Sequence, residues 1–312
     1  MSETVTASAP GKIILTGEHF VVHGAYSIAA AINKRVRVTI RKRVGASRIV
    51  SGSITSRISE NDGKFVAVKA ALRKVLEERN DGNLEVMISS ELPAGSGLGS
   101  SAAASVATAA AALKFLRMNV DQKIILEVAM HGERIIHGNP SGIDVEASLR
   151  GGLLLFSKNT GAKSITLDRP LQLLVAYSGV RRNTKRLIAK VAVKKKTFPH
   201  FFESLTNTSS FLTFSMLDSI ANGDLPRLGA YMNLSQATLG WLGVSNTTLE
   251  RMIEDVTDLG VFGAKLTGAG GGGSIIALPK PETTNSVLKV LSKEYHYAFI
   301  TSVPQRGLSW EK

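Results

Sequence analysis

One stretch of this sequence decides the fold: Leu92-Pro93-Ala94-Gly95-Ser96-Gly97-Leu98-Gly99-Ser100-Ser101-Ala102. It follows a strand-like segment, 84–88, and leads into an alanine-rich run, 102–116, that predicts a helix. Glycine lets a backbone approach a ligand closely. The first N–H groups of a helix lack internal partners and carry the positive end of its dipole. The stretch is therefore a candidate seat for phosphate.

This loop differs from two familiar phosphate-binding motifs. No lysine stands between Gly99 and Ser100, where a Walker A loop would need one. The Gly-x-Gly-x-x-Gly spacing of a Rossmann turn is absent as well. Taken alone, the loop is also compatible with an ordinary connection that caps a helix, so the rest of the chain must decide.

The composition is that of a globular protein with a substantial core. The chain has 312 residues, of which 44% are hydrophobic and 20% charged, enough for one large or two medium domains. It has no cysteine, which excludes disulfides, thiolate metal sites and a cysteine nucleophile. The sequence shows neither a secretory signal nor 18 consecutive strongly apolar residues, so we expect a cytoplasmic protein without a membrane partner.

The net charge of +13 allows two interpretations, nucleic-acid binding or attraction of anionic small substrates. The basic residues are spread along the chain, apart from one cluster at Lys190, Lys194, Lys195 and Lys196. Aromatic residues make up only 6% and do not interleave with this cluster, as a platform for stacking bases would require. We therefore expect no nucleic-acid partner and place the cluster on a solvated face.

The order of predicted elements favours an α+β fold with two lobes, 1–165 and 166–312. Alternating or continuous apolar residues predict strands at 4–9, 36–42, 151–156, 171–177, 274–278 and 297–303. Helical periodicity predicts helices at 65–78, 121–137, 249–256 and 282–294. The polar segment 158–170 is expected to carry the chain towards the second lobe.

Three further segments combine glycines with charged side chains. They are Pro10-Gly11-Lys12-Ile13-Ile14-Leu15-Thr16-Gly17-Glu18-His19, Gly132-Glu133 with Gly138-Asn139-Pro140-Ser141-Gly142-Ile143-Asp144, and Lys265-Leu266-Thr267-Gly268-Ala269-Gly270-Gly271-Gly272-Gly273-Ser274. Two glycine-rich loops can hold a nucleotide phosphate chain, and a carboxylate with a serine hydroxyl suits Mg²⁺. A second carboxylate and a lysine supply a base and charge stabilisation, so the parts fit phosphoryl transfer.

In order and spacing, these segments resemble the three motifs of the GHMP kinase superfamily, most closely those of its mevalonate kinase family. The resemblance extends from about residue 5 to residue 278. It implies a ribosomal protein S5 domain 2-like first lobe and a ferredoxin-like α/β second lobe. It also implies phosphorylation of the 5-hydroxyl of (R)-mevalonate by ATP with Mg²⁺, an early step towards isoprenoids. A galactokinase would carry an aspartate shortly after Glu18-His19, and none stands there.

The resemblance assigns roles to individual residues. Asp144 matches the catalytic aspartate that accepts the hydroxyl proton, and Lys12 matches its lysine partner. Ser101 and Glu133 match the Mg²⁺ ligands, while Glu18, His19 and Thr184 match positions near mevalonate. The residues matched to the ATP site are Pro93, Ala94, Gly95, Ser96, Gly97, Leu98, Gly99, Ser100, Ser101, Gly268, Gly270 and Gly271.

Other functions stay open at this point. A related kinase acting on homoserine or phosphomevalonate would share the ATP loops and differ at Glu18, His19 and Thr184. A non-catalytic metabolite-binding regulator on the same fold would have no need of Lys12 and Asp144 together. A nucleic-acid binder is the remaining alternative, and the sequence leaves a homodimer open.

Overall fold

The computed structural model describes most of the chain: residues 4–78, 83–138, 140–181, 184–295, 297–304 and 306–311. Asn139, in the third predicted segment, lies outside the described residues. Within these ranges, the strands of the first lobe are β1 (Thr4–Thr16), β2 (Ser27–Lys42), β3 (Arg48–Ser51), β4 (Ile54–Arg57), β5 (Leu84–Ser90), β6 (Leu153–Ser157), β7 (Gly161–Ile165) and β12 (Ser309–Glu311).

The long strands β1 and β2 form the centre of the first sheet. They pair antiparallel, with Val5 opposite Ile40 and Ile13 opposite Ala30. The sheet runs in the order β12-β1-β2-β5-β3-β4, and β6 joins β2 and carries β7 at its other edge. Along β2 the alternation of apolar and basic residues places Val36, Val38 and Ile40 in the core, as the sequence predicted.

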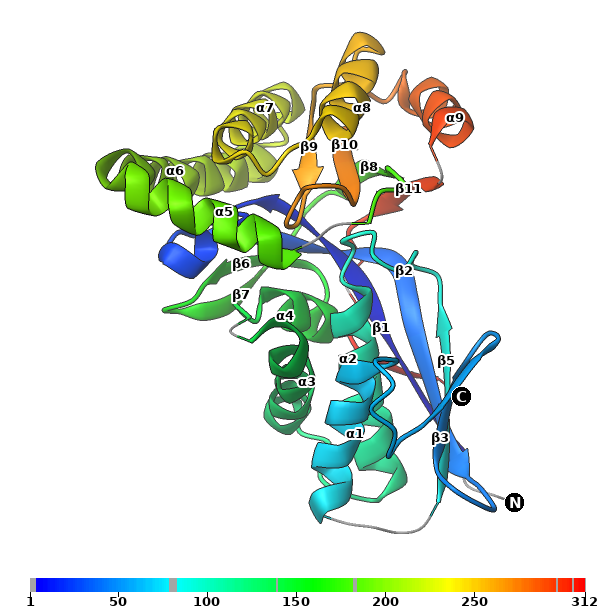
Figure 1. Cartoon of the computed structure of the whole chain (residues 1–312). Coiled ribbons are helices and arrows are strands. Elements are labelled where there is room, and N and C mark those ends of the chain that lie inside the picture. Colours follow the sequence, from blue (N-terminus) through cyan, green and yellow to red (C-terminus); the bar gives the residue numbers. More distant parts are fainter. Residues whose placement is uncertain are drawn as a thin grey trace.

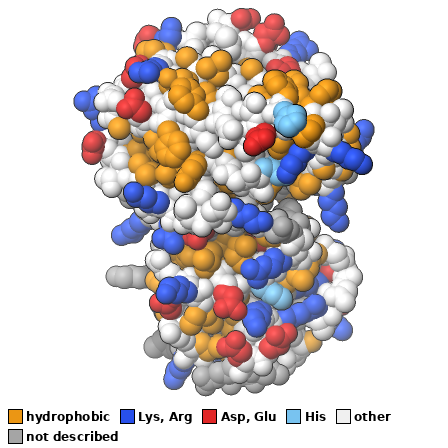
Figure 2. All heavy atoms as spheres, turned by 90° about the vertical axis from the view of Figure 1, so that its left-hand side faces the viewer, with side chains coloured by type: hydrophobic (Ala, Val, Ile, Leu, Met, Phe, Trp, Pro, Cys, Tyr) orange, Lys and Arg blue, Asp and Glu red, His pale blue; other side chains and the backbone are white. Residues whose placement is uncertain are grey.

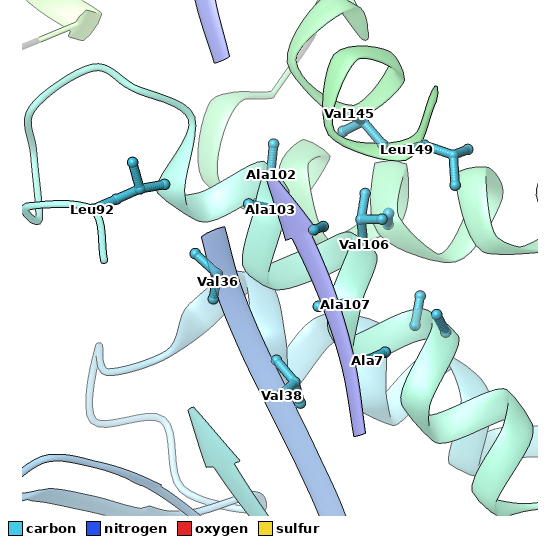
Figure 3. Packing of buried hydrophobic residues seen from close by; sticks show 14 of the residues in the cluster. Ala7, Val36, Val38, Leu92, Ala102, Ala103, Val106, Ala107, Val145 and Leu149 are labelled. Carbon is cyan, nitrogen blue, oxygen red and sulfur yellow. The ribbon is translucent and has the colours of Figure 1, made fainter. Parts of the chain in front are cut away.

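Four helices cover one face of this sheet (Figure 1): α1 (Val66–Glu78), α2 (Ser100–Phe115), α3 (Gln122–His137) and α4 (Ile143–Arg150). The alanine-rich helix α2 is the central one, since it contacts β1, β2 and the other three helices. Its small side chains pack directly against Ala7, Val36 and Val38 of the sheet (Figure 3). A helix buried on nearly all sides needs apolar residues all round, which explains its weak amphipathic character.

The second lobe holds a four-stranded antiparallel sheet of β8 (Gln172–Tyr177), β9 (Gly263–Thr267), β10 (Ser274–Leu278) and β11 (Tyr297–Ser302). Its strand order, β11-β8-β10-β9, is the ferredoxin-like order that the resemblance implied. Its helices are α5 (Thr184–Thr197), α6 (Pro199–Asn222), α7 (Leu225–Leu242), α8 (Thr247–Asp258) and α9 (Thr284–Glu294). Helices α7, α8 and α9 pack on the strands of this sheet.

The two lobes are distinct in outline but share packing. The molecule narrows between them, and apolar side chains gather on the surface of the upper lobe (Figure 2). The main hydrophobic cluster nevertheless extends from β1 and β2 into the second lobe, where it includes Val175 and Ile276. In the described part of the chain, no helix is both long and apolar enough to cross a membrane.

The segment 158–170 departs from its expected role as a plain connection. It contains β7, which folds back on β6 and pairs Leu153 with Ile165. The chain crosses to the second sheet only after this hairpin, at β8. The last strand, β12, returns to the first sheet, where Ala7 lies opposite Trp310.

Candidate active site

A cavity of about 480 Å³ lies where the two lobes meet. Seven residues that the sequence assigned to the site line it, although they come from five separate parts of the chain. They are Lys12, Glu18, His19, Glu133, Asp144, Thr184 and Gly268. The fold therefore brings together the predicted catalytic and substrate positions.

The ion pair of Lys12 and Asp144 is the chemical centre of this cavity. Lys12 Nζ lies 3.2 Å from Asp144 Oδ1 and donates a hydrogen bond of 3.1 Å to the carbonyl oxygen of Gly97. Lys12 is buried on β1, whereas the Asp144 side chain, in the first turn of α4, is 35% exposed. A carboxylate that is open on one side and held by a cation on the other is placed to act as a general base.

The glycine-rich loop 93–101 wraps around Lys12. The Lys12 N–H donates to Leu98 O at 2.8 Å, and Gly99, with φ of +78°, caps the start of α2. A Cβ on Gly99 would lie 2.8 Å from Lys12 Cγ, which explains why glycine is needed there. The hydroxyl of Ser274 from the second lobe donates to Ser96 O at 2.9 Å. The loop is thus held from both lobes, with the N-terminus of α2 behind it.

The loop and the cavity are neighbouring parts of one site. None of the nine residues 93–101 lines the cavity itself. They connect to it through Gly97, which binds Lys12, and through Ser101, which binds Glu133. The loop therefore adjoins the cavity without forming part of its wall.

Ser101 and Glu133, the two residues matched to the Mg²⁺ ligands, are hydrogen-bonded to each other. Ser101 Oγ donates to Glu133 Oε1 at 2.5 Å, which joins the first turn of α2 to the C-terminal half of α3. Burial raises the pKa of Glu133 to about 7, and the negative charge of Asp144 adds to this rise. A buried carboxylate near a second carboxylate favours a bound cation, and one hydroxyl and one carboxylate suit Mg²⁺, which keeps several waters. The residues therefore fit the ion.

Glu18 and His19 occupy a strained turn after β1. His19 has φ of +63°, an uncommon conformation for a residue with a side chain. Its Nε2 lies 2.9 Å from the carbonyl oxygen of Ala269, so Nε2 carries the proton and donates across the lobes. Glu18 forms a buried ion pair with Lys265 of β9. Burial raises the pKa of Glu18 and lowers that of Lys265, against the attraction between them.

The glycine-rich turn 268–273, in the fourth segment, lies partly at the cavity and partly against other residues of the second lobe. Gly268 lines the cavity, as does Thr184 at the start of α5. Gly270 and Gly271 do not line it; a Cβ on Gly270 would lie 2.2 Å from Val244 O, and one on Gly271 2.9 Å from a Leu187 methyl carbon. These two glycines allow the β9–β10 turn to pack tightly, and their role at a nucleotide stays a prediction.

Lys265 is the residue that reasoning from the sequence missed. It stands in the fourth segment, but no role was assigned to it because its partner lies 247 positions away. A lysine at the centre of a run that reads as a buried strand, Gly263 to Thr267, is the signal that would have identified it.

Comparison with known proteins identifies relatives over the whole chain. Residues 66–152 match the GHMP kinases N terminal domain, residues 216–296 the GHMP kinases C terminal domain, and residues 1–42 the galactokinase galactose-binding signature. The mevalonate kinase of Aeropyrum pernix is 34% identical over 100% of both chains. That of Archaeoglobus fulgidus is 36% identical over 88% of this chain and 93% of its own.

A solved structure agrees with these sequence relatives. The crystal structure of L. major mevalonate kinase in complex with R-mevalonate superposes with a TM-score of 0.84 at 28% identity. The match covers 97% of this chain and 96% of that one. The expected superfamily, with both of its domains, is thereby confirmed.

Proposed function

The chain belongs to the mevalonate kinase family of the GHMP kinases, and from this premise we propose that it transfers the γ-phosphoryl group of ATP to the 5-hydroxyl of (R)-mevalonate. The observation that carries the proposal is the ion pair of Lys12 and Asp144 in the wall of the cavity. A cavity of about 480 Å³ is in the range of small-molecule sites.

Asp144 and Lys12 have complementary roles in this reaction. The proton of the 5-hydroxyl passes to the Asp144 carboxylate as the hydroxyl oxygen forms a bond to the γ-phosphorus. The bond between the γ-phosphorus and the β–γ bridging oxygen breaks, and ADP leaves with that oxygen. Lys12 stabilises the negative charge on the attacking oxygen and the transferred group, which is the main requirement of phosphoryl transfer.

The ATP phosphates are placed against loop 93–101. The N-terminus of α2 offers unpaired N–H groups and a positive dipole end. Ser101 and Glu133 would hold Mg²⁺, which neutralises phosphate oxygens when bound. Gly268, Gly270 and Gly271 support this region from the second lobe.

We assign mevalonate to the cavity itself, near Glu18, His19 and Thr184. Cations near the cavity favour an anionic substrate: Lys158 lines it, and Lys195 of α5 lies 3.3 Å from Nδ1 of the lining residue His23. The presence of Lys12 and Asp144 together weighs against a non-catalytic regulator. The homodimer and the cytoplasmic location stay predictions.

The decisive experiment is a substrate panel. The purified protein is incubated with Mg-ATP and, separately, mevalonate, phosphomevalonate, homoserine or galactose, while ADP release and product mass are followed. Galactose belongs in the panel because residues 1–42 match a galactose-binding signature.

We expect ADP release with mevalonate alone, accompanied by a product with the mass of 5-phosphomevalonate. Turnover of a different alcohol would agree with the assigned phosphate site but would contradict mevalonate as the substrate. If none of the four compounds is phosphorylated, the non-catalytic metabolite-binding regulator becomes the favoured function instead.

A further inference from the structure

The ion pair of Glu18 and Lys265 has an unusual environment. Lys265 is fully buried and Glu18 is 5% exposed, and their ion pair joins the turn after β1 to strand β9 of the second lobe. Lys265 Nζ also donates to Leu266 O at 2.6 Å. Lys265 contacts only one of the two Glu18 carboxylate oxygens, Oε1.

The second oxygen, Oε2, is buried and has no hydrogen-bond partner among the described residues. Glu18 is at the same time a lining residue of the cavity. A buried charged oxygen without a partner is costly, and native proteins rarely keep one unless a ligand or water completes it. Because Glu18 lines the cavity, its unpartnered oxygen is the group that a hydrogen-bond donor of a bound ligand would complete.

Stability alone does not explain this pair. Burying two charges costs desolvation free energy, and an apolar pair of similar size is often at least as stable in the same place. A buried ion pair is therefore weak evidence for a role in stability. Glu18 without Lys265 would be driven by burial towards its neutral form. The charge of Lys265 lowers the pKa of Glu18 against the larger effect of burial, and its hydrogen bond to Oε1 leaves Oε2 as the oxygen without a partner.

The donor can be identified from the chemistry of the substrate. Mevalonate has two hydroxyl groups and a carboxylate, and the carboxylate is repelled by Glu18. The 5-hydroxyl belongs at Lys12 and Asp144 under the proposed function, on which this inference rests. The 3-hydroxyl is the one remaining donor.

We propose that Lys265 is a positioning residue that holds the Glu18 carboxylate so that Oε2 accepts a hydrogen bond from the 3-hydroxyl of mevalonate. The pair then selects for a hydroxyl at this carbon. A substrate lacking it leaves the charged oxygen unpaired in the closed complex, which is a strong basis for discrimination.

The test compares two substrates in each protein: mevalonate and its 3-deoxy analogue, 5-hydroxy-3-methylpentanoate. In the wild type we expect kcat/KM to be about 10- to 100-fold higher for mevalonate, the range for a hydrogen bond to a charged group. In Lys265→Met this ratio should fall to within about threefold, and Lys265→Arg should restore much of it.

Two further variants complete the design. If Lys265→Met fails to fold, the double variant Glu18→Gln/Lys265→Met removes both charges and is expected to show the same loss of discrimination. Glu85→Gln is the matched control, since Glu85 is a buried carboxylate paired with Arg41, Arg43 and Arg48 away from the cavity. It should change stability and leave the substrate ratio unchanged.

The outcomes separate this inference from the proposed function. A wild type that phosphorylates neither compound would overturn the function itself. A wild type that prefers mevalonate, together with a Lys265→Met protein that keeps the full preference, would leave the function standing and overturn the role of Lys265.

Discussion

At the scale of single residues, Asp144 offers the most direct test of the chemistry. Asparagine has nearly the same shape but cannot accept the hydroxyl proton. We expect Asp144→Asn to lower kcat by about 10²- to 10⁴-fold, the usual contribution of a general base. Affinity for ATP should be nearly unchanged, because the loop 93–101 and α2 are untouched. Steady-state kinetics and nucleotide titration measure both, and unchanged turnover would rule out Asp144 as the base.

The raised pKa of Glu133 makes the free energy of unfolding depend on pH. Its pKa is raised from 4.5 to about 7 in the folded protein without a cation. Between these values the folded protein keeps a proton that the unfolded chain has released, so raising the pH through this window lowers the free energy of unfolding. The loss approaches about 3 kcal/mol above pH 7.

Glu133→Gln lacks this titration and is therefore the matching variant. Without metal it should melt close to the wild type at pH 5 and a few degrees higher at pH 8. Glu85→Gln should instead melt at a lower temperature than the wild type at pH 8. Hydrogen bonds from Arg41 and Arg48 lower the pKa of Glu85, so its charged form stabilises the fold. Equal melting temperatures for Glu133→Gln and wild type at pH 8 would contradict the assignment.

The residues also show what a sequence can and cannot predict. Lys12, Glu133 and Asp144 stand in dense motifs, so their meeting at one cavity was predictable from the resemblance. Lys265 was not, because its role depends on a contact with Glu18 that only the assembled lobes create. The free Oε2 of Glu18 likewise depends on which atoms surround it, and no local pattern records that.

At the scale of elements, the start of α2 decides how the loop meets Lys12. Gly99 combines a φ of +78° with a close approach to the Lys12 side chain. Gly99→Ala adds the strain of a left-handed alanine, about 1–2 kcal/mol, and pushes Lys12 away from Gly97 O. We expect kcat to fall at least about tenfold, since a displacement of about 1 Å can cost far more.

Gly260→Ala is the control for this strain. Gly260 has a φ of +80°, but a Cβ there would meet nothing within 4 Å. Both variants should lose similar stability in chemical unfolding, and only Gly99→Ala should lose activity. Equal loss of kcat in both would mean that the contact with Lys12 does not matter.

The elements themselves were predictable where their periodicity was strong. The amphipathic run at Leu249, Met252 and Val256 became α8, and the alanine run became α2. The short strand β7 was missed because its residues, Gly161–Ile165, are polar and exposed enough to read as a loop. It is stabilised by pairing with β6, which is a tertiary contact rather than a local preference.

At the scale of the whole molecule, the site exists only because the lobes are held in one arrangement. Two buried threonines of the second lobe join it to the first through backbone N–H groups. Thr267 Oγ1 accepts from Ile14 N at 2.7 Å, and Thr301 Oγ1 accepts from Asn33 N at 3.1 Å. Strand β12 pairs with β1 only at Thr6 to Ser8, so Ile14 lies on an edge that Thr267 covers instead.

These two threonines separate the stability of the interface from the geometry of the site. Valine has the shape of threonine but cannot accept a hydrogen bond. Thr267→Val leaves the buried N–H of Ile14 unpaired and should lower the free energy of unfolding by about 1–3 kcal/mol. Thr301→Val should lower it less, because its partner Asn33 is exposed to solvent. Ile14 lines the cavity beside Gly268, the neighbour of Thr267, whereas Asn33 and Thr301 do not line it. We therefore expect KM for mevalonate to rise severalfold in Thr267→Val alone. Equal kinetics in the two variants would show that the cavity does not depend on how closely β1 and β9 are joined.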